Sequence, residues 1–234
     1  MRLDKLLADA GYGSRKEVKK LLKSGVVSIN QKVNKDPKTQ VDPSSEEVIV
    51  AGEAVHYQSE VYLMLNKPKG VISATEDSMH RTVIDLIDEK WASYSIFPVG
   101  RLDKDTEGLL LLTTDGSFSH RLMSPRQHVS KVYQAKIDGM VTDEDIEAFR
   151  VGVELDDGYV TKPAVLTILE SNEISNIELT ITEGKFHQVK RMFKAREKTV
   201  LALKRRAIGK LDLDESLAPG QYRELTEEEL ALFE

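Results

Sequence analysis

Cysteine is absent from this sequence of 234 residues, and its absence excludes several classes of protein. Without thiols the chain forms neither disulfide bonds nor thiolate metal sites. The zinc-dependent base deaminases need cysteine ligands, so they are excluded as well. The five histidines show no paired spacing of the kind that holds zinc on a helix, and we expect no metal. The lack of cysteine agrees with a cytoplasmic location, which we also expect.

Long apolar runs and nucleotide-binding motifs are missing too. No run approaches the roughly 20 apolar residues that cross a bilayer, and residues 1–5 lack the apolar core of a signal peptide. We therefore expect no association with a membrane. The sequence contains no phosphate-binding loop and no dinucleotide fingerprint. With no cofactor expected, the remaining options are chemistry by side chains alone, or binding without catalysis.

The charge is unevenly distributed along the chain. The net charge is −6, which by itself argues against a nucleic-acid partner. Residues 1–40, however, carry ten Lys and Arg against four Asp and Glu, and residues 185–210 carry ten Lys and Arg against one Glu. A phosphate backbone responds to the local field, which salt screens beyond about 10 Å. These clusters favour a polyanion-binding protein, with ordinary solvated surface charge as the alternative.

Residues 1–57 have the pattern of a small separate module. Ser14 and Glu17 form a capping box that opens a helix, and Gly25 is placed to end it. One stripe of this helix is apolar and another is basic, which is typical of a phosphate-contacting surface. Short strands are expected at residues 26–30 and 47–51, followed by a polar linker at 52–60. The candidate RNA contacts of the module are Arg15, Lys16, Lys19 and Lys20.

The remaining residues, 58–234, mix strand and helix patterns without regular alternation. Strands are expected at 61–65 and 109–112, and a strand with alternating apolar residues around 177–181. Apolar spacing predicts an amphipathic helix over residues 83–91. Further helices are expected after Thr142, at 189–193 and after Thr226. This irregular order predicts an α+β fold rather than a doubly wound sheet.

The stretch from Gly100 to Gly108 is the most informative part of the sequence. It is a charged turn that runs directly into the predicted buried strand, and such rims commonly carry functional sites. An ordinary acidic surface turn is the alternative. The turn resembles the first half of a calcium-binding loop, but the position that needs a bidentate Glu is Thr114, which follows a run of leucines. A calcium site is therefore rejected.

Two other stretches carry candidate site residues. In residues 183–192 a glycine precedes a helix start, where exposed backbone N–H groups favour an anion, and Lys190 lies one turn beyond Phe186. An ordinary basic helix is the alternative. In residues 131–133 an aromatic ring, Tyr133, stands beside a cation at a strand start, and such a ring can stack on an unstacked base. A structural aromatic is the alternative for Tyr133.

Taken together and in this order, these stretches resemble the bacterial ribosomal RNA pseudouridine synthases of the small-subunit type, over essentially the whole chain. Residues 1–57 are similar to the RNA-binding module shared with a small-subunit ribosomal protein. The Gly100-Arg101-Leu102-Asp103 element is highly specific to these synthases. The other matching segments are Leu65-Asn66-Lys67-Pro68-Lys69-Gly70, Thr106-Glu107-Gly108-Leu109, Lys131-Val132-Tyr133, Thr161 to Val165, Glu183 to Phe193, Leu217-Ala218-Pro219-Gly220 and Tyr222-Arg223.

The resemblance implies a catalytic domain with a mixed, mainly antiparallel sheet and flanking helices, and no cofactor. By matching position, Asp103 is the nucleophile or base, Arg101 helps to displace the target base, and Tyr133 stacks against it. Lys190 stands where the wider group has arginine, so it pairs with the aspartate but lacks the bidentate fork. With the basic surfaces, the resemblance predicts further RNA contacts from the following residues: Lys67, Lys185, His187, Gln188 and Arg191.

The resemblance also implies a substrate. It is uridine 516 of 16S ribosomal RNA, in free RNA or in a ribosomal assembly intermediate, and the protein is expected to act as a monomer. Two alternatives stay open from the sequence: a synthase for large-subunit RNA, and a catalytically silent RNA-binding assembly factor. Asp103 discriminates against the silent binder, because a carboxylate that faces a phosphate-rich ligand repels it.

Overall fold

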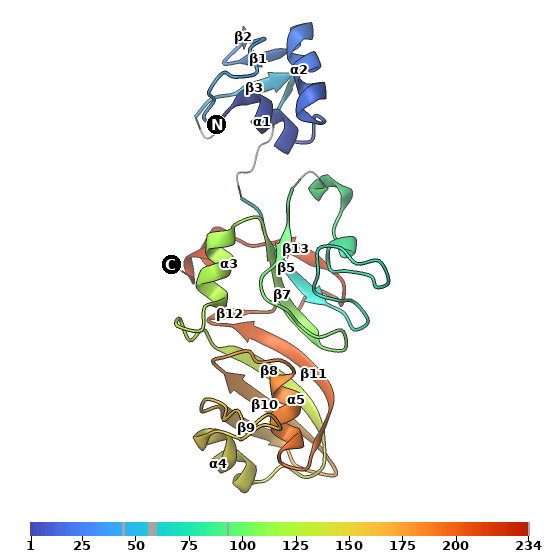
Figure 1. Ribbon diagram of the computed structural model, residues 1–234, viewed down its shortest axis with the longest axis vertical. Helices are drawn as coiled ribbons and strands as arrows, with labels where there is room; N and C mark the ends of the chain where they lie inside the picture. Colours follow the sequence, from blue (N-terminus) through green and yellow to red (C-terminus); the bar gives the residue numbers. More distant parts are fainter. Residues whose placement is uncertain (44, 56–59, 93, 234) are drawn as a thin grey trace. The chain divides into compact units, whose positions relative to one another are not determined.

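The computed structural model describes residues 1–43, 45–55, 60–92 and 94–233. These residues divide into two compact units (Figure 1). Unit 1 comprises Met1–Glu60 with Asp88–Ser95, and unit 2 comprises Val61–Ile87 with Ile96–Glu234. The predicted boundary between residues 57 and 58 lies outside the described residues.

Unit 1 contains the predicted helices and short strands. Helix α1 spans Leu3–Asp9 and α2 spans Arg15–Ser24. The capping box is present as predicted: Ser14 accepts a hydrogen bond from the backbone of Glu17, whose carboxylate accepts one from the backbone of Ser14. Gly25 ends α2 in the left-handed conformation, also as predicted. The apolar stripes of both helices pack on a sheet of order β2-β1-β3-β4, whose strands span Lys32–Val33, Val27–Ile29, Val48–Val50 and Glu53–Ala54.

The predicted linker at residues 52–60 is wrong at its beginning. Glu53–Ala54 form β4, which pairs antiparallel with β3. Ala51 and Gly52 both have positive φ, 53° and 92°, and this is the backbone of a tight hairpin turn. An alanine in such a turn gives little sequence signal, so the hairpin was not expected. Residues 56–59 of the predicted linker lie outside the described residues.

Unit 2 is built on one large sheet of strand order β13-β5-β7-β11-β8-β10-β9 (Figure 1). Neighbouring strands pair antiparallel except β7 and β11, the only parallel pair among the described strands. The sheet is thus mixed and mainly antiparallel, and the predicted α+β class is confirmed. The strands of unit 2 are β5 Tyr62–Lys67, β6 Phe97–Pro98, β7 Glu107–Thr113, β8 Lys131–Asp138, β9 Val165–Glu170, β10 Ile174–Ile181, β11 Thr199–Ile208, β12 Leu211–Asp212 and β13 Tyr222–Glu224.

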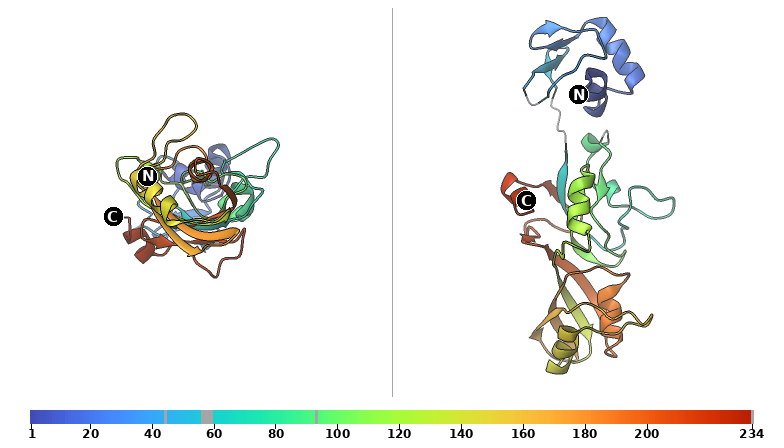
Figure 2. Two further views of the ribbon diagram at one scale, coloured as in Figure 1. Left: turned by 90° about the horizontal axis from the view of Figure 1, so that it is seen from below. Right: turned by 60° about the vertical axis from the view of Figure 1, so that its left-hand side comes forward.

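Helices cover the sheet at both of its ends. Helix α3, Gly116–Met123, begins after Asp115, whose carboxylate accepts backbone hydrogen bonds, and it packs beside β5 and β7 (Figure 2). Helices α4, Asp143–Val151, and α5, Gln188–Lys194, pack near the other end, where the rings of Phe149 and Phe193 meet edge to face at 4.9 Å. Helix α6, Glu227–Ala231, follows the capping residue Thr226 as predicted.

The predicted amphipathic helix over residues 83–91 is wrong. The segment forms short 3₁₀ turns at Ile84–Leu86 and Glu89–Trp91, separated by extended backbone at Ile87 and Asp88. The carboxylate of Asp85 accepts hydrogen bonds from the backbone and hydroxyl of Thr82. Together with the bond from the backbone N–H of Asp85 to the hydroxyl of Thr82, they form a capping box that starts a turn, and the extended backbone at Ile87 and Asp88 ends it.

The parallel contact between β7 and β11 joins the two halves of the sheet. Its register pairs are Glu107 with Lys204 and Gly108 with Arg205. At Gly108, with φ +101°, an added Cβ would lie 2.2 Å from the carbonyl oxygen of Arg205. Only glycine permits this approach, so the sequence Glu107-Gly108 fixes where the halves meet.

Gly108→Ala should destabilise the protein by about 3 kcal/mol or more, because overpacking here meets backbone rather than a movable side chain. The melting temperature should fall by about 6 °C or more, since each kcal/mol shifts it by about 2–4 °C in a chain of this size. Gly116→Ala is the matched control, because no atom lies within 4 Å of its added Cβ. Equal melting temperatures for both variants would contradict the assigned role of Gly108.

Candidate functional site

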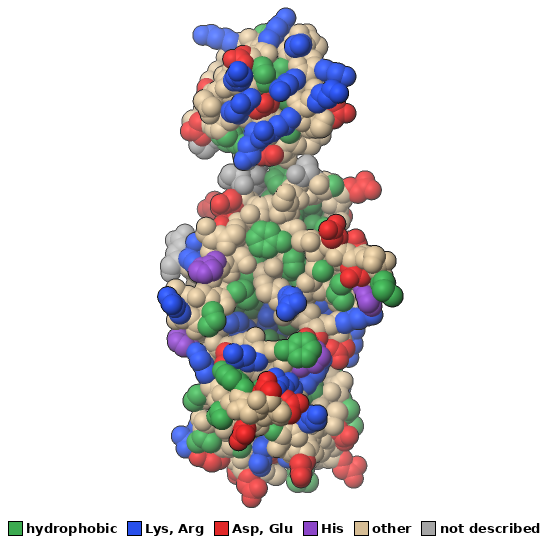
Figure 3. Space-filling model, viewed as in Figure 1, with side chains coloured by type: hydrophobic (Ala, Val, Ile, Leu, Met, Phe, Trp, Pro, Cys, Tyr) green, Lys and Arg blue, Asp and Glu red, His purple; other side chains and the backbone are tan. Residues whose placement is uncertain are grey.

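A cleft of about 780 Å³ opens in unit 2 at the junction of β7 and β11. Its lining comes from the turn at residues 100–106, from β8 and β11, and from the segment that leads into α5. Lys and Arg side chains gather around the hollow in the space-filling view (Figure 3). The residues brought together here include the predicted site residues Arg101, Asp103, Tyr133 and Lys190.

Asp103 meets a cation inside the cleft. The Nζ of Lys190 donates to Oδ2 of Asp103 at 3.1 Å and to Oδ1 of Asp105 at 2.6 Å. Burial alone would lower the pKa of Lys190, but the hydrogen bonds to Asp105 and Asp103 outweigh it and raise that pKa. The Nε2 of His187 lies 3.6 Å from Oδ1 of Asp103. Lys190 is therefore a protonated bridge between two carboxylates, one of which faces the cleft.

Buried Lys67 holds the turn that carries Asp103. Its side chain is 0% exposed, and its Nζ donates to the carbonyl oxygens of Pro68, Asp103 and Thr106 at 3.0, 3.0 and 2.9 Å. Burial lowers the pKa of Lys67 to about 8, against the opposing field of nearby carboxylates including Asp103. An ammonium group enclosed in this way does not reach an RNA phosphate. The predicted RNA contact of Lys67 is therefore wrong, and its role is to position the turn.

A second set of bonds fixes the same turn from the side of residues 70–73. The hydroxyl of Ser73 donates to the carbonyl oxygen of Leu102 and accepts from its N–H, at 2.9 and 3.0 Å. The backbone N–H of Gly70 donates to the carbonyl oxygen of Lys104 at 2.8 Å. The carboxylate of Asp103 thus stands on backbone tied from several directions, as a catalytic group requires.

Tyr133 and Arg101 both line the cleft but differ in their exposure to solvent. Tyr133 is buried on β8 and faces the cleft, whereas Arg101 is exposed at its rim. A buried ring suits stacking, and an exposed guanidinium is free to move toward a nucleic acid.

Gln188 is a structural residue, contrary to the predicted RNA contact. It is 4% exposed, and its Nε2 donates to Oε1 of buried Glu183 at 2.8 Å, while its Oε1 accepts from the backbone of Lys185 at 2.9 Å. Glu183 also accepts hydrogen bonds from the hydroxyl of Tyr159 and the backbone of Lys162. The amide of Gln188 is therefore used in hydrogen bonds that hold the loop before α5.

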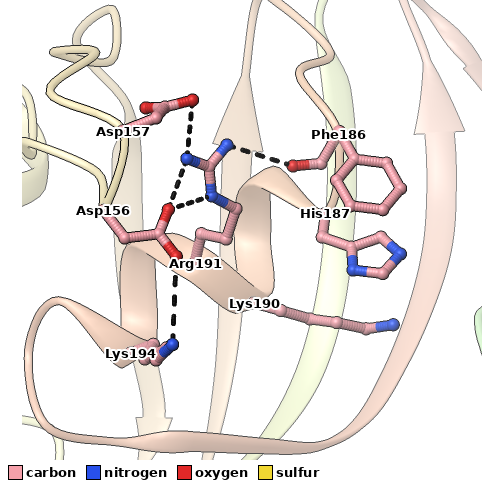
Figure 4. Close-up of a pocket in the computed structure, with 7 residues that line it drawn as sticks. All are labelled: Asp156, Asp157, Phe186, His187, Lys190, Arg191 and Lys194. Atoms are coloured by element: carbon pink, nitrogen blue, oxygen red, sulfur yellow. Dashed lines mark hydrogen bonds and ion pairs between the residues drawn. The ribbon is translucent and has the colours of Figure 1, made fainter.

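Arg191 is largely occupied by acidic partners in a smaller pocket of about 520 Å³ (Figure 4). Its guanidinium pairs with Asp156 and Asp157, and it points away from Lys190 in Figure 4. The ring of His187 stacks on the exposed ring of Phe186, with centroids 3.8 Å apart. Of the predicted contacts in this segment, Lys185 and His187 are exposed to an RNA and Arg191 is mostly covered.

The basic surface of unit 1 is exposed as the sequence analysis requires. All four candidate contacts lie on α2 or at its start, and Figure 3 shows Lys and Arg side chains spread over this unit. These exposed residues are Arg15, Lys16, Lys19 and Lys20.

Two residues that line the cleft had no role assigned to them from the sequence. Lys131 and Arg205 are 8% and 3% exposed and line the cleft on β8 and β11. Arg205 lies between the buried residues Leu203 and Ala207 on β11. A cation between apolar residues of a strand was the available signal, and the abundance of charge in residues 185–210 obscured it.

The described residues contain no helix long and apolar enough to cross a membrane. Within the same part of the chain, no group of three or more His, Asp and Glu side chains is arranged to hold a metal ion.

Comparison with known proteins identifies the domains. The family model for RNA pseudouridylate synthase matches residues 61–195, the segment that contains most of the residues lining the cleft. The chain belongs to the RNA pseudouridylate synthase family. An S4 domain model matches residues 1–47, within the unit that carries the basic surface of α2. The family membership predicted from the Gly100–Asp103 element and its companion segments is thus confirmed.

Relatives that match over nearly the whole chain are named as pseudouridine synthases, and some names specify the ribosomal small subunit. The chain is 55% identical over 234 residues to an uncharacterized RNA pseudouridine synthase, YtzG, of Bacillus subtilis, and covers 98% of it. It is 39% identical over 232 residues to ribosomal small subunit pseudouridine synthase A of Escherichia coli, and covers 99% of it. A solved structure described as a pseudouridylate synthase has 37% identity and a TM-score of 0.71, over 100% of this chain and 99% of that one.

Lys67→Met should destabilise the protein without weakening its binding to RNA. The variant removes three hydrogen bonds to carbonyl groups, of which that of Asp103 keeps another donor, the backbone N–H of Thr106. Each unmade buried bond costs about 1–3 kcal/mol. The melting temperature should fall by at least about 5 °C, while the RNA dissociation constant, measured well below that temperature, stays within about twofold. Weaker binding with an unchanged melting temperature would return Lys67 to the role of a phosphate contact.

Proposed function

We propose that this protein converts one uridine of small-subunit ribosomal RNA into pseudouridine, with Asp103 as its catalytic carboxylate. The observation that carries the proposal is the carboxylate of Asp103 in the cleft, 3.1 Å from the ammonium group of Lys190. The names of the full-length relatives support ribosomal RNA of the small subunit as the substrate class. Within that RNA, the proposed target is uridine 516.

The reaction breaks the bond between uracil nitrogen and ribose, turns the base, and joins a uracil carbon to the same ribose carbon. The uracil carbon that joins ribose loses its hydrogen as a proton, and the freed uracil nitrogen gains a proton, so no atoms or electrons are added. A carboxylate serves this sequence either by attacking the sugar carbon or by removing the neighbouring proton. The ammonium group of Lys190 lies 3.1 Å from Oδ2 of Asp103 and pairs with the carboxylate, which suits both roles.

A uridine inside a helix is out of reach of Asp103, so the base must leave the stack. Flipping costs a few kcal/mol, which stacking and phosphate contacts offset. We assign the displacement of the base to Arg101, which is exposed at the rim of the cleft, and its stacking to the buried ring of Tyr133. The cleft then holds the detached uracil while it turns.

The remaining assignments concern the partner and the setting. We assign phosphate contacts to the exposed cations of α2 and to Lys185 and His187 beside the cleft. Residues 1–57 serve as the RNA-binding domain and 58–234 as the catalytic domain. The substrate is ribosomal RNA or a ribosomal assembly intermediate, and the protein acts in the cytoplasm as a monomer.

Asp103→Asn should reduce pseudouridine formation below about 1% of wild type, because losing a nucleophile or base costs several orders of magnitude. RNA affinity should stay within a few-fold, because removing a negative charge does not weaken polyanion binding. Single-turnover rate and affinity are measured on one RNA.

Asp105→Asn is the matched control for this prediction. Asp105 shares Lys190, but its side chain is 69% exposed against 31% for Asp103. Losing one such hydrogen bond should cost at most about tenfold in rate. A rate for Asp103→Asn close to that of Asp105→Asn would remove Asp103 from the catalytic role.

Replacing Lys16 and Lys20 by Gln should flatten the salt dependence of RNA binding. Each lost phosphate contact lowers the slope of log K against log salt by about 0.7–0.9. Lys32 and Lys38, replaced together by Gln, form the control, because they are exposed in the same unit but lie outside α2. The same slope for both double variants would show that α2 does not contact phosphates.

A further inference from the structure

Lys131, Tyr133 and Arg205 share one face of the sheet inside the cleft. Lys131 and Tyr133 are two residues apart on β8, so their side chains point to the same face. Arg205 is the registered partner of Tyr133 on the neighbouring strand β11. All three residues line the cleft. Two cations therefore flank the ring that is assigned to stack on the flipped base.

Neither of these buried cations has a carboxylate partner among the described residues. Arg205 donates from Nε to the carbonyl oxygen of Leu109 at 2.8 Å, and its Nη2 is buried without a hydrogen-bond partner. Lys131 donates from Nζ to the carbonyl oxygen of Val129 at 2.8 Å. Burial lowers the pKa of Lys131, and the positive charge of Arg205 lowers it further. The two charges thus lie close enough to repel each other across the floor of the cleft.

Several other cations of unit 2 have carboxylate or carbonyl partners that compensate their charge. Lys198 and Arg196 both pair with the buried carboxylate of Asp145, and Lys190 bridges Asp103 and Asp105. Lys67 is enclosed by three carbonyl groups. An unused donor on a buried guanidinium costs free energy, and an anion that binds in the cleft would remove that cost.

We propose that Lys131 and Arg205 form a phosphate site that holds the RNA backbone next to the flipped uridine. This inference rests on the proposed function. Uracil is neutral and does not compensate two positive charges, whereas a backbone phosphate presents charged oxygens to the free Nη2 of Arg205 and to the ammonium of Lys131. The site adjoins Tyr133, so the phosphate is one that flanks the target nucleotide. Holding that phosphate keeps the ribose in place while the detached uracil turns beside Asp103.

The test uses RNA fragments of the small-subunit sequence in which a neutral methylphosphonate replaces the phosphate on one side of the target uridine or the other. Wild-type protein should bind one of these two RNAs about tenfold or more weakly than the unmodified RNA, as expected for a charge-assisted hydrogen bond. Arg205→Met should bind the unmodified RNA with a similar loss. It should lose less than about twofold more on the methylphosphonate RNA, because the contact is already gone.

Lys131→Met repeats the cycle with a second variant, so the inference does not depend on Arg205→Met folding. Lys136→Met is the matched control, because Lys136 lies on β8 but is exposed on the opposite face. It should retain the full methylphosphonate effect. Losses in Arg205→Met and Lys131→Met that simply add to the methylphosphonate loss would overturn the phosphate site. An absence of any methylphosphonate effect in the wild-type protein would do the same. Pseudouridine formation by the wild-type protein on the unmodified RNA tests the proposed function separately.

Discussion

The burial of the Lys67 ammonium is the constraint on which the site depends. A fully buried positive charge is tolerated here because three carbonyl groups accept hydrogen bonds from it and nearby carboxylates stabilise it electrostatically. Two of those carbonyls belong to Asp103 and Thr106. The hydrogen bonds that compensate the charge of Lys67 therefore also fix the shape of the turn. The fold thereby positions the backbone of Asp103 and leaves its side chain directed to the cleft. Lys190, on α5, then donates a hydrogen bond to that carboxylate and pairs its positive charge with it.

The sheet supplies the second half of the arrangement. Its halves meet through the parallel contact between Gly108 on β7 and Arg205 on β11, where a side chain at position 108 would not fit. That contact places the turn of Asp103 beside the face that carries Tyr133. The cleft is therefore a consequence of how the sheet is joined, and its chemistry comes from side chains on both halves. One cleft thereby brings together a carboxylate, a buried aromatic ring and several cations.

Local signals in the sequence were sufficient for much of this structure. The capping box of Ser14, the buried run after Gly108 and the Gly100–Asp103 turn each depend on neighbouring residues, and each was predicted. The burial of Lys67, Gln188 and Arg205 was not predicted, because a polar residue in a charged stretch is expected to face solvent. Their burial depends on sheet register and on partners far away in the chain, such as Leu109 for Arg205. The apolar pattern over residues 83–91 did not produce a continuous helix, because the backbone is extended at Ile87 and Asp88 and only single turns form.

The most direct test of the central claim counts the hydrogen that leaves the uracil carbon when it joins ribose. Purified protein is incubated with small-subunit or large-subunit ribosomal RNA, each labelled with tritium at that carbon of every uridine, and the tritium released to water is measured. The account predicts release from small-subunit RNA that reaches a plateau at about one uridine per molecule, and none from large-subunit RNA. Release from large-subunit RNA alone, or from neither RNA, would contradict it.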